Sequence, residues 1–199
     1  MKPTRRTDMI HTNINGFDLE FRTSEELFSP RSIDRGTLAM LSVAEFEKGD
    51  KVLDLGCGYG VVGIVAAKIV GPENVVMIDN NEKAIELSHE NTVGNDVEGV
   101  KILLSDGFRG LDEKDFTVIL CNPPYHVDFS VPKMFIEKGF NRLAVGGRML
   151  LVTKRRKWYQ NKLTAIFGGV KTRGIDDYWV FVSIKKSATY AKAGKKAAR

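Results

Sequence analysis

The stretch KVLDLGCGYGVVG at residues 51–63 decides the fold. Val52, Leu53 and Leu55 form a short apolar run that ends at a cluster of glycines, which predicts a buried strand. Apolar residues at helical spacing follow over 61–70. A strand, a glycine-rich turn and a helix form the first half of a βαβ unit, so we expect a parallel sheet.

The glycines of this stretch allow two interpretations. Gly56, Gly58 and Gly60 let the backbone approach a ligand closely, because a Cβ would be in the way. The spacing Gly58-x-Gly60-x-x-Gly63, followed by Asp79, also matches the fingerprint of dinucleotide-binding proteins. By itself this pattern leaves a nicotinamide-dependent oxidoreductase open.

Strands and helices alternate along the rest of the chain. Six further strands are expected, over 75–78, 100–104, 118–121, 148–153, 170–173 and 179–185. The pattern predicts an α/β fold with a doubly wound, mostly parallel seven-stranded sheet. Asn15-Gly16 predicts the turn of a short N-terminal β-hairpin over 11–22. We expect a single domain over 1–185 and a basic tail over 186–199.

Two local predictions concern helix ends. Asp34 follows a loop and is placed to cap a helix over 38–46, in which Leu38, Leu41 and Phe46 would face inward. Asn81 can start a later helix, which the polar segment 91–99 would end.

The positive charge is unevenly distributed. The 199 residues carry a formal net charge of +5, and residues 185–199 contain six basic and no acidic residues. Without these six, 24 basic residues face 25 acidic ones. A second basic cluster at 154–157 precedes Trp158 and Tyr159. Cations beside aromatic rings are typical of surfaces that bind nucleic acid.

The composition argues against several other classes of protein. A run of eighteen apolar residues is absent, so no membrane span is expected. The N-terminus lacks an apolar signal core, which favours a cytoplasmic protein. The two cysteines, Cys57 and Cys121, give neither a metal cluster nor a disulfide framework, and we expect buried, reduced thiols.

Polar groups follow four consecutive predicted strands, at Asp54, Asp79, Asp106 and Asn122. Ligands of doubly wound sheets bind beyond the carboxyl ends of the strands. Asp79 can accept both ribose hydroxyls, and Asp106 can accept from an exocyclic adenine amine. The sequence therefore predicts a nucleoside lying across the strand ends.

The segment Asn122-Pro123-Pro124-Tyr125 indicates the chemistry. The prolines fix φ and remove N–H donors. The remaining groups, the Asn122 side-chain carbonyl and the Pro123 backbone carbonyl, can each accept one hydrogen of a planar amine stacked on Tyr125. This arrangement suits attack by an amine nitrogen and offers nothing for a hydride.

These motifs resemble a known family. DLGCGYG, Asp79, Ser105-Asp106 and NPPY occur in the order seen in class I S-adenosylmethionine-dependent methyltransferases that modify planar amines. LFSPRSIDRGT together with NPPYH resembles the methyltransferase small domain family more narrowly, over nearly all of residues 13–185. The resemblance implies a Rossmann-like methyltransferase sheet and S-adenosyl-L-methionine as cofactor, with no metal.

The resemblance also implies roles for individual residues. The cofactor would be held by Thr37, Asp54, Gly56, Gly58, Gly60, Asp79, Asn80, Asp106, Gly107 and Asn122. The catalytic motif would be Asn122, Pro123, Pro124 and Tyr125. Substrate contacts would come from Phe28, Tyr125, His126, Lys154, Arg155 and Arg156.

The function implied is N-methylation of an exocyclic base amine in RNA, with guanine N2 of small-subunit ribosomal RNA as the first choice. DNA adenine, tRNA or a protein glutamine amide stay open as acceptors, as does an RNA-binding protein without activity. The larger ribosomal RNA enzymes of the family carry an extra N-terminal domain, and we expect none here. We therefore expect substrate recognition by the hairpin, the segment 154–157 and the tail.

Overall fold

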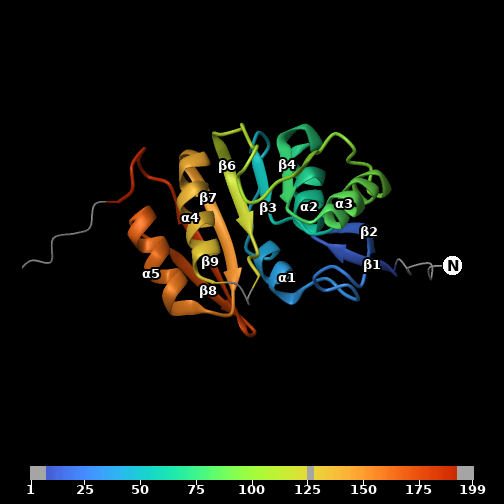
Figure 1. Ribbon diagram of the computed structural model, residues 1–199, viewed down its shortest axis with the longest axis horizontal. Coiled ribbons are helices and arrows are strands. Elements are labelled where there is room, and N and C mark those ends of the chain that lie inside the picture. The colour runs from blue at the N-terminus through green and yellow to red at the C-terminus, as the bar shows by residue number, and fades with distance from the viewer. Residues whose placement is uncertain (1–7, 125–127, 192–199) are drawn as a thin grey trace, which may run out of the picture.

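The computed structural model describes residues 8–124 and 128–191, which build a central seven-stranded sheet (Figure 1). The strand order is β5-β4-β3-β6-β7-β9-β8, and β9 runs antiparallel to both of its neighbours. The strands are β3 (Val52–Leu55), β4 (Val75–Asp79), β5 (Lys101–Leu104), β6 (Phe116–Cys121), β7 (Leu143–Thr153), β8 (Lys171–Ile175) and β9 (Tyr178–Ile184). The predicted α/β sheet is confirmed.

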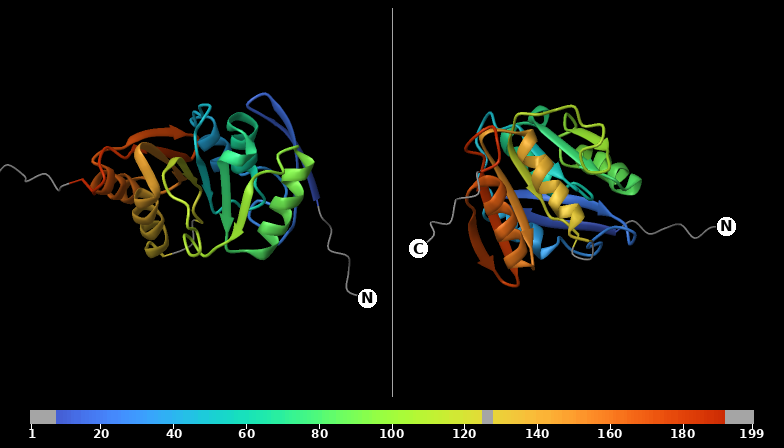
Figure 2. Two further views of the ribbon diagram at one scale, coloured as in Figure 1. Left: turned by 90° about the horizontal axis from the view of Figure 1, so that it is seen from above. Right: turned by 60° about the vertical axis from the view of Figure 1, so that its left-hand side comes forward.

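Helices cover both faces of the sheet (Figure 2). They are α1 (Arg35–Leu41), α2 (Val61–Val70), α3 (Glu82–Gly94), α4 (Ser130–Arg142) and α5 (Arg156–Phe167), with a short 3-10 turn at Pro72–Asn74. The core on one face joins alternate strand residues to α1, α2, α3 and the hairpin. The core on the other face joins the intervening strand residues to α4 and α5. This division follows from the two-residue period of strands.

The N-terminal hairpin consists of β1 (Asp8–Ile14) and β2 (Phe17–Thr23). Asn15 and Gly16 both have positive φ, at 54° and 85°, so the predicted Asn-Gly turn is confirmed. The hairpin lies against α3, where Asn91 and Asn95 accept from and donate to the β2 backbone. The polar segment that was expected to end α3 is therefore partly inside the helix, and these two asparagines are buried.

The helix predicted over 38–46 spans Arg35–Leu41 instead, and Leu41 is buried as predicted. The side chain of Asp34 accepts a hydrogen bond from the Thr37 amide at 2.8 Å, which confirms the cap, but the helix starts directly after it and ends at Leu41. This start turns Ala39, Met40 and Leu41 inward and leaves Leu38 38% exposed, so the prediction for Leu38 was wrong.

The chain after β9 turns back onto the helices. The Ala191 amide donates to the Ile166 carbonyl, and the Tyr190 ring meets Phe140 at 5.0 Å between centroids. The first residues of the expected tail therefore pack against α4 and α5. Within the ranges 8–124 and 128–191, no helix combines the length and the hydrophobicity that a bilayer crossing requires.

Candidate active site

A cavity of about 390 Å³ opens where the parallel strands end. Its walls come from the loops after β3, β4, β5 and β6, the segment before α1, and the start of α4. The predicted site residues that line it are Phe28, Thr37, Asp54, Gly56, Gly58, Asp79, Asn80, Asp106, Gly107, Asn122, Pro123 and Pro124. Residues distant in sequence are therefore brought together as the strand-end argument predicted.

The glycine turn contributes bare backbone to the cavity. Gly56 and Gly58 have φ of 79° and 56°, a region that favours glycine, and a Cβ added at either would meet no atom within 4 Å. Gly60 does not line the cavity and instead precedes α2. Gly63 is required for close packing, because a Cβ added there would come within 2.2 Å of the Met77 sulfur.

Asp54 places a carboxylate at the N-terminal turn of α2. Its Oδ2 accepts from the Gly63 amide in the first turn of α2 at 2.9 Å, and its side chain is buried. Burial raises the pKa of Asp54 to about 7. The charge of Asp79 raises this pKa further, and the hydrogen bond from Gly63 opposes the rise. A carboxylate here repels an anion and attracts a cation.

Asp79 is oriented by the backbone. Its Oδ2 accepts from the Gly58 amide at 2.9 Å and its Oδ1 from the Asn81 amide at 3.0 Å. Asp106 lies at the exposed rim, 3.8 Å from Arg109. The described lining contains four carboxylates, Asp34, Asp54, Asp79 and Asp106, and no lysine, arginine or histidine. This charge disfavours a pyrophosphate and fits a positively charged nucleoside derivative.

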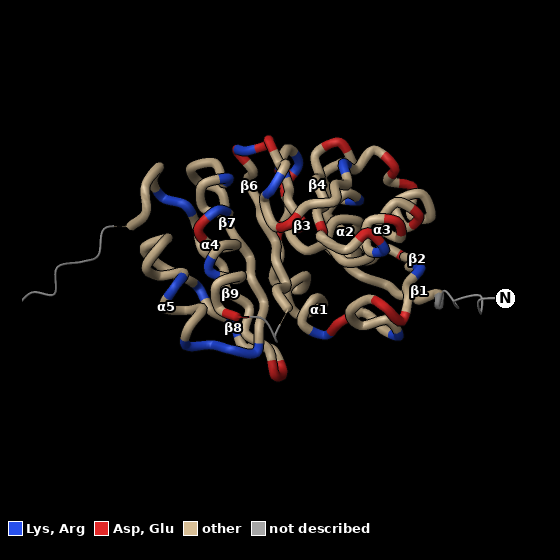
Figure 3. Tube along the Cα trace, in the orientation of Figure 1, with Lys and Arg blue, Asp and Glu red and all other residues tan. Residues whose placement is uncertain are grey.

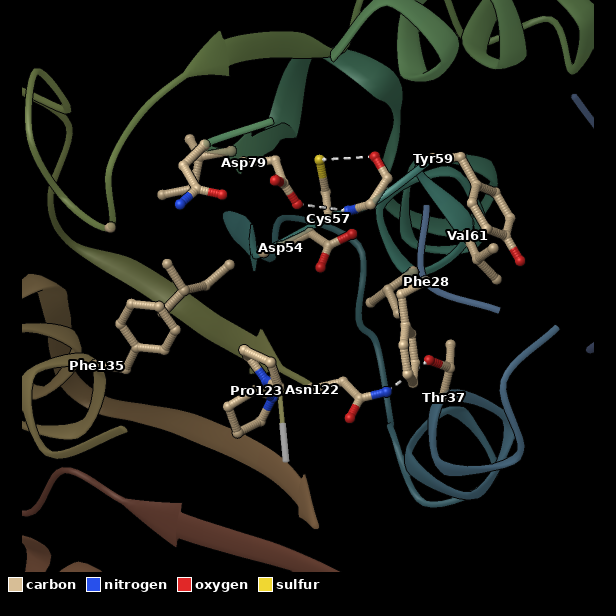
Figure 4. A pocket seen from close by; sticks show the side chains of 18 of the residues that line it. Phe28, Thr37, Asp54, Cys57, Tyr59, Val61, Asp79, Asn122, Pro123 and Phe135 are labelled. Atoms are coloured by element: carbon tan, nitrogen blue, oxygen red, sulfur yellow. Dashed lines mark hydrogen bonds between the residues drawn. The ribbon is translucent and has the colours of Figure 1, made fainter. Parts of the chain in front are cut away.

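Asn122 lies at the other end of the cavity from Asp79, with Asp54 between them (Figure 4). Its Nδ2 donates to Asp34 Oδ2 at 2.8 Å and to Thr37 Oγ1 at 3.0 Å. Asp34 was predicted only as a helix cap, and no sequence signal linked it to Asn122. Tyr125 and His126, which were also predicted here, lie outside the described residues.

Apolar side chains close the remaining walls. Ile33 precedes α1, and Val131, Met134 and Phe135 come from the first turns of α4. No motif in the sequence assigned these four residues to the site. An apolar wall beside Asp106 and Gly107 suits the flat face of a base.

The basic residues at 154–157 do not line the cavity, but they follow β7 at the same edge of the sheet. Figure 3 shows a run of basic residues where the chain passes from β7 into α5. Lys154, Arg155 and Arg156 lie over the rings of Tyr178, Phe129 and Trp179, at 5.0, 5.1 and 4.2 Å from the ring centroids. The Phe129 ring also stacks on Trp158 at 4.5 Å.

The two thiols are free and buried, as predicted. Burial and the nearby charges of Asp54 and Asp79 raise the pKa of both Cys57 and Cys121 well above its ordinary value. Neither thiol is therefore suited to act as a nucleophile. Among the described residues, no group of histidine, cysteine or carboxylate side chains could hold a metal ion.

The sheet order and the acidic strand-end cavity define a Rossmann-like methyltransferase domain. The family model of the methyltransferase small domain matches residues 18–181, and the chain belongs to this family. Family membership confirms the resemblance stated from the motifs and removes the oxidoreductase alternative.

Several relatives show how far the similarity extends. The uncharacterized protein YbxB of Bacillus subtilis (strain 168) is 34% identical over 142 residues, which cover 70% of this chain and 71% of that protein. Ribosomal RNA large subunit methyltransferase G of Yersinia pestis (strain Pestoides F) is 27% identical over 202 residues, 96% of this chain and 48% of that protein.

Among solved structures, the 16S rRNA N2 G1207 methyltransferase RsmC of T. thermophilus, in complex with S-adenosylmethionine and guanosine, superposes with a TM-score of 0.82. It is 26% identical, and the match covers 92% of this chain and 52% of that one. The chain thus spans about half the length of the two ribosomal RNA methyltransferases that it matches.

Proposed function

We propose that this protein transfers a methyl group from S-adenosyl-L-methionine to an exocyclic base amine of RNA, with guanine N2 of small-subunit ribosomal RNA as the acceptor. The observation that carries the proposal is the cavity itself, which has carboxylates along its length and an amide and two prolines at one end. Family membership and the two ribosomal RNA methyltransferase relatives support methylation of RNA. The choice of guanine N2 in the small subunit is supported by the likeness to the 16S enzyme alone, because the other relative acts on the large subunit.

The residues present fit the cofactor. Asp54, next to the bare backbone of Gly56 and Gly58, would hold the cationic methionine part. Asp79 has both carboxylate oxygens oriented by backbone amides and would accept the ribose hydroxyls. Asp106 and Gly107 would receive the adenine against the apolar wall of Met134 and Phe135. Asn80, Thr37 and Phe28 would border this ligand.

At the acceptor end, the Asn122 side-chain carbonyl and the Pro123 backbone carbonyl would each accept one hydrogen of the amine. When bound, S-adenosylmethionine would supply a methyl group whose C–S bond breaks as the amine lone pair forms the N–C bond, and the nitrogen then releases one proton to water. Tyr125 would stack on the base. Orientation and electrostatics then supply most of the rate.

The segment 154–157 would bind the RNA backbone. No acidic side chain of the described residues forms an ion pair with Lys154, Arg155 or Arg156. Three cations at the edge of the sheet that carries the cavity can bind phosphates while a flipped-out base enters the site. His126 would contact the base.

The deciding experiment supplies labelled cofactor together with unmethylated small subunits, large subunits, total tRNA, DNA or a release factor. Mass spectrometry then maps the methylated residue. Methylation of guanine N2 in small-subunit RNA supports the full proposal. Methylation of large-subunit RNA alone would overturn the choice of subunit, and methylation of DNA or protein alone would overturn RNA as the acceptor.

Cofactor choice is tested separately, without any acceptor. S-adenosylhomocysteine should raise the melting temperature in a concentration-dependent way, and NAD should not, because only a ligand that binds the folded state stabilises it. Stabilisation by NAD alone would contradict the proposal.

A further inference from the structure

The two hydrogens of the Asn122 side-chain amide are held by groups outside its own strand. Nδ2 donates to Asp34 Oδ2 at 2.8 Å and to Thr37 Oγ1 at 3.0 Å (Figure 4 shows the bond to Thr37). A carboxylate oxygen only accepts, so the NH₂ group must face Asp34. The carbonyl oxygen of the same amide therefore points away from Asp34 and Thr37.

The Asp34 carboxylate is itself fixed. Its Oδ2 also accepts from the Thr37 amide at 2.8 Å, and it caps α1. Asp34 and Asn122 are 88 residues apart in sequence, so this contact joins the start of α1 to the end of β6. A cap needs the bond to Thr37 only, and the bond to Asn122 is additional.

We propose that Asp34 is a positioning residue that orients and polarises the Asn122 amide for the amine acceptor, an inference that rests on the proposed function. Holding the NH₂ group fixes which amide atom faces the acceptor. The negative charge on the NH₂ side also increases the electron density on the carbonyl oxygen. A stronger acceptor stabilises the positive charge that develops on the nitrogen as it is methylated.

The test begins with Asp34→Ser, because serine caps a helix well but is too short to reach Asn122. We expect kcat to fall about 10- to 100-fold, the cost of one charge-assisted hydrogen bond. The KM for the cofactor and the thermal shift with S-adenosylhomocysteine should change far less than kcat. Asp176→Asn is the matched control, since it weakens the bond between Asp176 and Arg35 of α1 at 2.9 Å and leaves Asn122 alone.

A double-mutant cycle separates positioning from a structural role. In an Asn122→Ala background, Asp34→Ser should cause no further loss of kcat, since the group through which it acts is gone. An equal loss in both backgrounds would overturn the proposal.

Exchanging the side chains at positions 34 and 122 should restore part of the activity that Asn122→Asp loses. Asn122→Asp alone places two carboxylates next to each other and should lose activity. The double variant Asp34→Asn, Asn122→Asp has an amide donor at position 34 and a carboxylate acceptor at position 122, so the hydrogen bond between the two side chains can form again. We expect the double variant to be at least about 10-fold more active than Asn122→Asp alone. No rescue would count against the proposal.

A measurement independent of activity distinguishes this inference from the proposed function. Nuclear magnetic resonance of the Asn122 side-chain amide should show a proton shifted downfield and protected from exchange, and Asp34→Ser should abolish both effects. If no RNA is methylated but this signature is present, the proposed function fails and the Asp34–Asn122 contact stands. If the signature is absent from the wild-type protein, the positioning role is overturned.

Discussion

At the scale of single residues, the site depends on which hydrogen-bonding group each side chain presents. Asp54 and Asp79 present carboxylate oxygens that backbone amides orient, and Asn122 presents an amide whose NH₂ group is already bound. These groups favour a ligand with donors and positive charge.

Asn122→Ala should separate cofactor binding from turnover. We expect the thermal shift with S-adenosylhomocysteine to persist and kcat to fall at least about 100-fold, because the variant removes an acceptor of the amine hydrogens. Steady-state kinetics with the methylated RNA measure the effect. Turnover within a few-fold of the wild-type value would contradict the proposed role.

Asp54 should make the stability of the cofactor-free protein depend on pH. Its pKa rises from the ordinary 3.8 to about 7 because the side chain is buried. The folded state therefore holds the Asp54 proton more tightly than the unfolded state does. The free energy of unfolding has the full benefit of this difference below pH 4 and loses it as the pH rises to about 7. In urea unfolding, Asp54→Asn should therefore gain stability relative to the wild type between pH 4 and 8, by up to about 4 kcal/mol. Parallel pH profiles for the two proteins would show that Asp54 does not titrate in this range.

At the scale of elements, the glycine turn and α2 are held against β4 by close packing. Gly63 lies where a Cβ would come within 2.2 Å of the Met77 sulfur and 2.4 Å of its Cγ. Met77 is fully buried, so it cannot move aside without disturbing the core. The third glycine of the fingerprint therefore sets the distance between helix and strand and does not contact the ligand.

Gly63→Ala should destabilise the fold by about 1–3 kcal/mol, because the added methyl group overpacks the core. This cost exceeds the stabilisation expected from the higher helix propensity of alanine. Gly169→Ala is the matched control, because its Cβ would meet nothing within 4 Å and its φ is ordinary. Chemical denaturation measures both variants. Equal stabilities of Gly63→Ala and Gly169→Ala would contradict the overpacking argument and mean that Met77 repacks without cost.

At the scale of the whole molecule, the basic segment 154–157 and the cavity lie at the same edge of the sheet. The segment 154–157 follows β7 at the carboxyl edge, whereas Lys48, Lys171 and Lys186 lie at the amino edge, next to β3, β8 and β9. Since phosphate binding needs cations near the entering base, only the first group should matter for RNA.

Replacing Lys154, Arg155 and Arg156 with alanine should weaken RNA binding and lower the salt dependence of affinity, by about 0.7 in log–log slope for each lost phosphate contact with a single strand. The control replaces Lys48, Lys171 and Lys186, which removes the same charge from the other edge. Fluorescence anisotropy at several salt concentrations measures both. Equal slopes for the two variants would show that the RNA does not bind at residues 154–156.

Short-range rules determined most of the fold and half of the site. The apolar runs, the glycine turn and the Asn15-Gly16 hairpin depend on neighbours in sequence, so the strands and the carboxylates at their ends could be predicted. The helix after Asp34 was misplaced because a cap fixes where a helix starts, while the tertiary contacts of Ala39, Met40 and Leu41 fix which side is buried.

The sequence by itself determined the family, the parallel sheet and the acidic strand ends, since each is recorded in local patterns and motifs. Only the tertiary structure decided the contact between Asp34 and Asn122, the apolar wall from α4, and the binding of β2 by Asn91 and Asn95. These contacts join residues that are distant along the chain. Their geometry depends on how whole elements pack, which no local spacing encodes.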